Sequence, residues 1–195
     1  MEWRALLAAH GEPTVARMGR EARVLCLQDT TELDFSSQPG SIAGLGRLSY
    51  ERQHGMYLHP TLAVSEGGVA LGVLDAWMWA RKPKGKAAIR ESRRWTEGYE
   101  RIAEFAERLP DTRLVYVADR ESDLRELLDR AADLDHPADY LIRAKHDRLE
   151  VLSGNQPPVL RSSVQSCLML LEALSSEAIC RVPRVIANIP WMLCL

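Results

Sequence analysis

Two aspartates, Asp29 and Asp119, have the residue type and the setting that metal-dependent chemistry requires. Each follows directly on a short apolar run, residues 24–28 for Asp29 and residues 114–118 for Asp119. Such runs predict buried strands, and if the two strands are neighbours, both carboxylates emerge at the same edge of the sheet. Adjacent carboxylates repel unless a cation lies between them, and Mg²⁺ or Mn²⁺ is the usual cation for an all-oxygen site. Bound ions of this kind stabilise both the attacking and the leaving oxygen in phosphoryl transfer.

Other interpretations of the same aspartates stay open at this point. Aspartates commonly end strands because they form turns and cap helices, so a structural role is an alternative. Asp29 could also be the nucleophile of an aspartyl-phosphate phosphotransferase. Such enzymes usually have a second acidic residue two positions later, where this sequence has Thr31.

Apolar and amphipathic segments predict the elements that position these residues. The turn-rich residues 36–48 predict a loop, and Gly67-Gly68 predicts a hairpin turn. The order of the segments is strand-strand-strand-helix-strand-helix-strand, which predicts an α/β domain with a mixed sheet. The predicted strands are residues 23–28, 55–65, 69–81, 113–119 and 138–146, and the predicted helices are residues 96–109 and 121–134.

A change in composition divides the chain at about residue 148. Of 25 Lys and Arg and 27 Asp and Glu residues, only six fall in residues 149–195, which end on an apolar run. One interpretation of this atypical tail is a buried C-terminal helix and strand. Another is that a frameshift precedes it, so that the tail is out-of-frame or disordered.

A basic segment between residues 81 and 94 is a candidate phosphate-binding surface. Only Glu91 opposes its charge, although the whole chain has a formal net charge of −2 and so does not indicate a nucleic-acid binder by bulk charge. The alternative is a solvated loop that leads into a helix. The basic residues are Arg81, Lys82, Lys84, Lys86, Arg90, Arg93 and Arg94.

Targeting signals and cysteine spacing indicate the compartment. The N-terminal residues lack the apolar centre of a secretory signal, and no stretch of roughly 18 residues is apolar enough for a membrane span. We therefore expect a cytoplasmic protein without a membrane partner. Reduced thiols fit that compartment, because no pair has C-x-x-C or zinc spacing among Cys26, Cys167, Cys180 and Cys194.

Several ordered sequence blocks resemble one family. Residues 24–35 (VLCLQDTTELDF) and 115–124 (VYVADRESDL) resemble the first and second acidic motifs of DDE-type transposases of bacterial insertion sequences, of the IS-four type. That type cuts and pastes DNA through a hairpin intermediate. The similarity covers residues 1–148, and the further matching blocks, in the same order, are residues 55–64, 71–79, 91–95 and 141–148.

This resemblance implies an RNase H-like fold, Mg²⁺ or Mn²⁺ as cofactor, transposon-end DNA as partner and a bacterial cytoplasm. Asp29 and Asp119 match the family's first two metal-binding, catalytic aspartates. Arg143 and Lys145 match basic residues near transposon-end DNA. Residues that match neighbours of the carboxylates, and that would orient the aspartates and the phosphates, are Thr30, Thr31, Arg120 and Glu121.

The sequence also departs from the family pattern. The family's third carboxylate lies on a later helix with a tyrosine, an arginine and a lysine, and no Y-x-x-R-x-x-x-E pattern follows residue 148. Glu172 and Glu177 lack a tyrosine or arginine at the matching offsets, and no counterpart of the N-terminal DNA-recognition domain precedes the first motif. We therefore expect a partial catalytic core, with a sheet incomplete at its C-terminal end, that is inactive alone. The alternative is a non-catalytic DNA-binding or regulatory remnant, acting as a dimer on DNA or with a full-length transposase.

Overall fold

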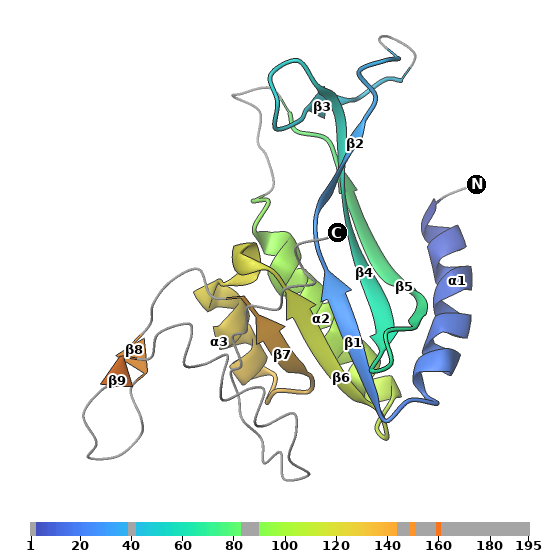
Figure 1. The fold of residues 1–195 in the computed structure, drawn as a ribbon, viewed down its shortest axis with the longest axis vertical. Helices are drawn as coiled ribbons and strands as arrows, with labels where there is room; N and C mark the ends of the chain where they lie inside the picture. Colours follow the sequence, from blue (N-terminus) through green and yellow to red (C-terminus); the bar gives the residue numbers. More distant parts are fainter. Residues whose placement is uncertain (1–2, 39–41, 83–89, 144–148, 151–158, 161–195) are drawn as a thin grey trace.

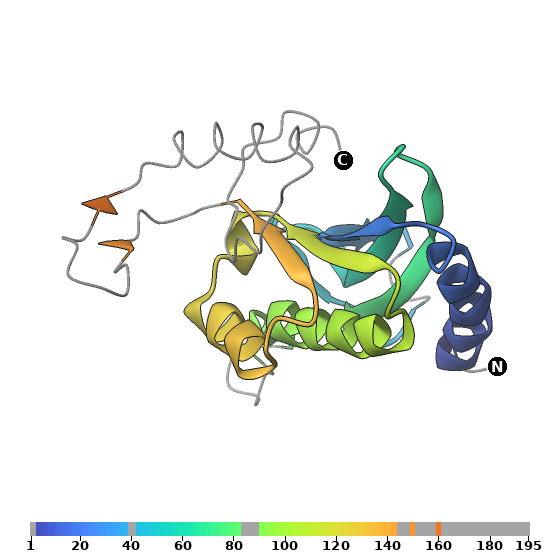
Figure 2. The ribbon, with the colours of Figure 1, turned by 90° about the horizontal axis from the view of Figure 1, so that it is seen from below.

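A seven-stranded mixed sheet with helices packed on it forms most of the part of the chain that the structure describes (Figures 1 and 2). The computed structural model describes residues 3–38, 42–82, 90–143, 149–150 and 159–160. The fold is therefore mixed α/β, as the sequence predicts. The strands of the sheet are β1 (Arg23–Gln28), β2 (Thr31–Asp34), β3 (Gly46–Arg47), β4 (His54–Ser65), β5 (Ala70–Trp79), β6 (Arg113–Ala118) and β7 (Asp139–Ile142).

The long strand β4 connects the two parts of the sheet. β5 pairs with it antiparallel, and β1 and β2 pair with it antiparallel one after the other. On its other edge β1 pairs with β6 in parallel, and β6 pairs with β7 in parallel. The hairpin from β4 to β5 turns at the predicted glycines, where Gly68 has a φ of +80° that suits a residue without a Cβ atom.

Two helices cover one face of the sheet, and a third lies beside β5 (Figure 2). A 3-10 turn, η1 (Arg120–Ser122), follows β6, and a two-stranded ladder of β8 (Leu149–Glu150) and β9 (Val159–Leu160) lies within the tail. The rest of residues 151–195 falls outside the described residues, so the interpretation of the tail remains a prediction. The α-helices are α1 (Trp3–Met18), α2 (Arg93–Arg108) and α3 (Arg125–Asp133).

All predicted strands and both predicted helices are present, with shifted ends. The strand predicted over 69–81 ends at Trp79, and the described part of the one predicted over 138–146 ends at Ile142. The predicted loop over 36–48 contains the two residues of β3. No helix in the described part of the chain is long and apolar enough to cross a membrane.

The sequence did not predict α1, because this helix contains Gly11 and Pro13 and has no apolar stripe. Contacts with the edge strand β5 stabilise it instead. The Arg17 Nε donates to the Leu71 carbonyl at 2.6 Å, and the backbone N–H of Val73 donates to His10 Nε2 at 3.1 Å. Tertiary packing therefore decides this helix where local propensity does not.

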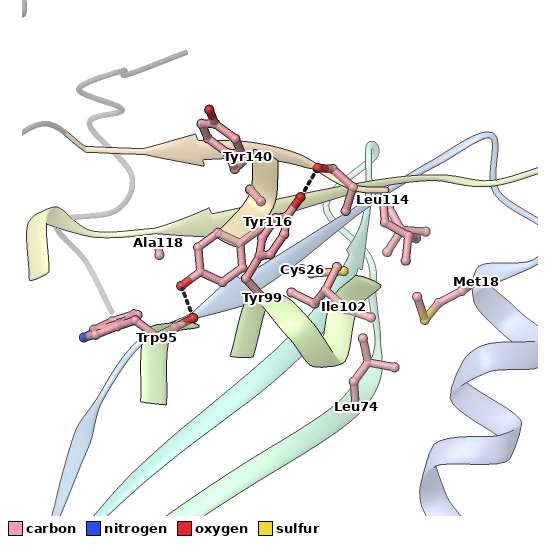
Figure 3. Close-up of a cluster of buried hydrophobic side chains, with 14 of the residues drawn as sticks. Met18, Cys26, Leu74, Trp95, Tyr99, Ile102, Leu114, Tyr116, Ala118 and Tyr140 are labelled. Atoms are coloured by element: carbon pink, nitrogen blue, oxygen red, sulfur yellow. Dashed lines mark hydrogen bonds between the residues drawn. The ribbon is translucent and has the colours of Figure 1, made fainter. Parts of the chain in front are cut away.

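The core between α2 and the sheet fixes where α2 begins (Figure 3). Trp95, Tyr99 and Ile102 on α2 are at most 1 % exposed and pack against residues of β1 and β6. The Tyr99 hydroxyl donates to the Ala138 carbonyl at 2.7 Å, and the Tyr116 hydroxyl donates to the Trp95 carbonyl at 3.5 Å. The first turn of α2 is therefore held at the carboxyl ends of the parallel strands (Figure 1).

Gly98 lets α2 approach β1 closely. A methyl group at this position would overlap the side-chain amide of Gln28, the last residue of β1. Gln28 is buried, and its Nε2 donates to Thr61 Oγ1 at 2.7 Å on the neighbouring strand. The amide therefore has little room to move away.

We predict that Gly98→Ala destabilises the protein by about 1–3 kcal/mol, because the added methyl group overpacks a buried contact. The matched control is Gly11→Ala in α1, where nothing lies within 4 Å of the added atom. That change should stabilise the protein by about 0.5–1 kcal/mol, since alanine is the better helix former. Urea denaturation of both variants measures the difference, and equal effects would contradict the close packing at Gly98.

Candidate metal centre

The register of β1 and β6 brings Asp29 and Asp119 together. Gln28 lies directly opposite Ala118 in this parallel pair, so the next residue on each strand is an aspartate at the same sheet edge. Neighbouring strands lie about 4.8 Å apart, which places the two backbones within reach of one shared cation. The two strands that precede the aspartates are therefore neighbours, as the prediction of a shared site required.

Each carboxylate is held by a backbone N–H group from the residues that follow it. Asp29 Oδ1 accepts from the N–H of Thr30 at 2.7 Å, and Asp119 Oδ1 accepts from the N–H of Glu121 at 2.8 Å. The second bond caps the 3-10 turn η1. The loops after the two strands thus orient the two carboxylates separately.

The surroundings raise the pKa of Asp29 above its ordinary value. Partial loss of hydration is the largest cause, and the negative charge of Asp119 acts in the same direction. The hydrogen bond from Thr30 and the positive charge of Arg94 lower this pKa, but they do not outweigh the two other causes. A cation between the carboxylates would relieve the repulsion.

Arg94, on the first turn of α2, is buried next to the loops that carry the two carboxylates. It is 8 % exposed. Its Nη2 donates to Glu121 Oε2 at 3.0 Å, its Nε lies 3.3 Å from Thr30 Oγ1, and its Nη1 donates to the Glu91 carbonyl. The guanidinium carbon also lies 5.0 Å and 5.2 Å from the ring centres of Trp79 and Trp95.

His59 on β4 contacts Thr30 and Trp95 from the sheet. Its Nδ1 lies 2.9 Å from Thr30 Oγ1, and its ring packs edge-on against Trp95 with the ring centres 4.4 Å apart. The pKa of His59 is lowered to about 3, mainly because the ring is buried and secondly because of the positive charge of Arg94. The imidazole is therefore neutral at physiological pH, and its buried Nε2 has no hydrogen-bond partner among the described residues.

The other predicted site residues lie near the two aspartates, on the exposed surface, or outside the described part of the chain. Arg120 is exposed beside Asp119, and the backbone N–H of Arg143 donates to the Ala118 carbonyl at 3.2 Å, which puts both at the sheet edge of the carboxylates. Thr31 is exposed at the start of β2, and Lys82 and Arg93 are exposed. Residues that fall outside the described part of the chain are Lys84, Lys86, Lys145, Glu172 and Glu177.

The sequence did not indicate the roles of Arg94 and His59 in this cluster. Arg94 lies in a basic run of the sequence, which predicts only that it is one of several candidate phosphate contacts. His59 stands alone on a predicted strand, without any metal-ligand spacing. Arg94 lies 64 positions from Thr30 in the sequence, and His59 lies 29 positions from it. No local sequence pattern could therefore have identified these contacts.

The donor set at this edge fits Mg²⁺ or Mn²⁺ held by two carboxylates. Within the described residues no three His, Cys, Asp or Glu side chains are grouped to hold a metal ion. Mg²⁺ is commonly bound through one or two carboxylates, with water and substrate phosphates as the remaining ligands. Cys26 takes no part, because burial raises the pKa of its thiol to about 12.

Neither the scan against protein-family models nor the search of curated proteins found a match for this chain.

We predict that Asp29→Asn raises the melting temperature at neutral pH in metal-free buffer. A raised pKa means that the ionised carboxylate is disfavoured in the folded state, so its cost is present above that pKa and disappears as the pH falls below it. The advantage of the variant should therefore shrink in acid. Added Mg²⁺ should stabilise the wild type more than the variant.

The matched control is Asp34→Asn, where the sign is opposite. Hydrogen bonds from Ser36 lower the pKa of Asp34, so its ionised form stabilises the fold at neutral pH and loses that effect in acid. This variant should melt at a lower temperature than the wild type at neutral pH. A lower melting temperature for Asp29→Asn as well would contradict the raised pKa of Asp29, because the ionised carboxylate would then stabilise the fold.

Proposed function

We propose that residues 1–148 are part of the RNase H-like catalytic core of a DDE-type transposase, with Asp29 and Asp119 as two of its metal ligands. The observation that carries the proposal is the parallel register of β1 and β6, with Gln28 opposite Ala118, which brings both aspartates to one sheet edge. The blocks that resemble the family's two acidic motifs, residues 24–35 and 115–124, contain these two residues. Residues 149–195 remain an atypical tail in this proposal.

The strand arrangement agrees with the proposal. Antiparallel strands β5, β4 and β1 are followed by the parallel strands β6 and β7, with helices between the later strands. An RNase H-like core has such a meander followed by helix-linked strands. The fold thus supports the same assignment as the motifs, although many functions share one fold.

The chemistry follows from what each side chain would do at a DNA phosphate. Bound Mg²⁺ would polarise the phosphate and lower the pKa of a bound water. Asp29 and Asp119 would hold the ion, while the loops containing Thr30 and Glu121 would keep their carboxylates oriented. In transposases of the family that the sequence resembles, such a site cuts one strand, and the freed 3′-hydroxyl then attacks the opposite strand and later the target DNA.

Basic side chains, all exposed except the half-buried Arg143, would supply the DNA contacts. Arg120 and Arg143 flank the carboxylates at the sheet edge, and Lys82, Arg90 and Arg93 lie before and at the start of α2. Contacts of this kind are made to phosphates and depend on salt rather than on sequence. The DNA partner, the bacterial cytoplasm and a dimer on DNA all follow from the family resemblance.

A second candidate function is that of a non-catalytic DNA-binding or regulatory remnant that assembles with a full-length transposase. It is favoured by the lack of a third ligand near the pair in the described residues. Two carboxylates rarely hold two ions in working geometry, so we expect little or no transposition by this chain alone. The two candidates differ in whether the chain nicks supercoiled plasmid DNA with Mg²⁺ or Mn²⁺.

We predict that the protein binds Mn²⁺, and that Asp29→Asn and Asp119→Asn each weaken this binding by at least about 10-fold, because each removes a ligand. Titration of Mn²⁺, followed by calorimetry and electron paramagnetic resonance, measures the affinity. The control is Asp111→Asn, an exposed aspartate at the opposite end of β6, which should bind Mn²⁺ like the wild type. Equal binding by all four proteins would refute the proposed metal centre.

We also predict salt-dependent retention of double-stranded DNA. Lys82→Ala and Arg120→Ala should each weaken binding about equally on unrelated sequences, and each should reduce the slope of log affinity against log salt by about one. The control is Arg108→Ala at the far end of α2, where the side chain is bonded to Glu12. Slopes that are the same in all variants would exclude this surface as the DNA contact.

A further inference from the structure

Arg94 contacts both loops that carry the candidate metal ligands. Its Nε lies 3.3 Å from Thr30 Oγ1, in the loop after β1, and its Nη2 lies 3.0 Å from Glu121 Oε2, in the turn after β6. The backbone N–H groups of these same two residues donate to Asp29 and Asp119. One guanidinium group thus links the hydrogen bonds that orient both carboxylates.

The environment leaves Arg94 little freedom to do anything else. Its side chain is 9 % exposed, whereas its partner Glu121 is 59 % exposed. The rings of Trp79 and Trp95 lie on the guanidinium, and the Glu91 carbonyl accepts from its remaining nitrogen. A buried charge with all three nitrogens bonded is a fixed part of the structure rather than a free phosphate contact.

We propose that Arg94 is a positioning residue that sets the separation of Asp29 and Asp119 by holding Thr30 and Glu121 with one planar group. The effect on metal binding rests on the proposed function, whereas the effect on the two loops does not. The geometry requires arginine, because a lysine ammonium is a point charge on a single nitrogen and cannot make the bonds that the three guanidinium nitrogens make to Thr30, Glu121 and Glu91. The assignment also separates Arg94 from its neighbour Arg93, which is exposed and bonded to Glu97 on its own helix.

Arg94→Lys is the decisive variant, because it keeps the charge and removes the planar fork. NMR measurement of amide proton exchange, without metal, reports the two loops. We expect the Thr30 and Glu121 amide protons to exchange several-fold faster than in the wild type, since their bonds to the carboxylates open more often. Amides in the centre of β4, such as that of Leu62, should be unchanged.

Mn²⁺ affinity is the second measurement on the same proteins. Loss of a group that orients metal ligands typically weakens binding by about 10- to 100-fold, and we expect a change of that size in Arg94→Lys. Retention of DNA at low salt should stay the same. The matched control is Arg101→Lys, also on α2, whose exposed side chain is bonded only within its helix to Glu104.

A second variant covers the case in which Arg94→Lys does not fold. Glu121→Gln removes the charge of an exposed side chain and keeps the backbone N–H that bonds Asp119. We expect it to fold, to speed exchange at Glu121 and Thr30, and to weaken Mn²⁺ binding in the same direction by a smaller factor. Circular dichroism establishes folding before either measurement.

The outcomes separate this inference from the proposed function. Faster exchange together with weaker Mn²⁺ binding supports the positioning role. Faster exchange in a protein whose wild type binds no Mn²⁺ refutes the metal centre but supports Arg94 as the residue that positions the carboxylate pair. Unchanged exchange overturns the proposal, as does unchanged Mn²⁺ affinity in a variant with loosened loops.

Discussion

The parallel pairing of β1 and β6, which brings Asp29 and Asp119 to neighbouring positions, is the constraint on which the rest of the candidate site depends. The parallel register of β1 and β6 fixes the positions of the two aspartates, because the residues before them, Gln28 and Ala118, lie directly opposite each other. Their shared negative charge contributes to the raised pKa of Asp29. A fold that keeps such a pair must provide positive charge and hydrogen-bond donors nearby, or leave room for a cation.

Helix α2 provides the positive charge, and the core determines that it can. Trp95, Tyr99 and Ile102 bury one face of the helix, and Gly98 allows it to lie close to the end of β1. These contacts place the first turn, with Arg94, behind the carboxylates. The packing of α2 against the sheet thus fixes the position of Arg94 in the candidate site.

Two buried groups, the His59 imidazole and the Cys26 thiol, keep one protonation state near neutral pH. Burial keeps His59 neutral, and burial also keeps the Cys26 thiol protonated. The surroundings of Asp29 raise its pKa, and a cation bound between the carboxylates would lower it.

The sequence by itself determined the alternation of strands and helices and the two aspartates at strand ends, because apolar periodicity and turn residues are local signals. It did not determine α1, whose Gly11 and Pro13 weaken every local helix signal and whose stability comes from contacts with β5. Nor did it determine the place of Arg94, since a basic run has the same appearance whether its side chains face solvent or the core. Only the tertiary structure, by packing α2 against β1 and β6, decided which arginine of that run lies behind the carboxylates.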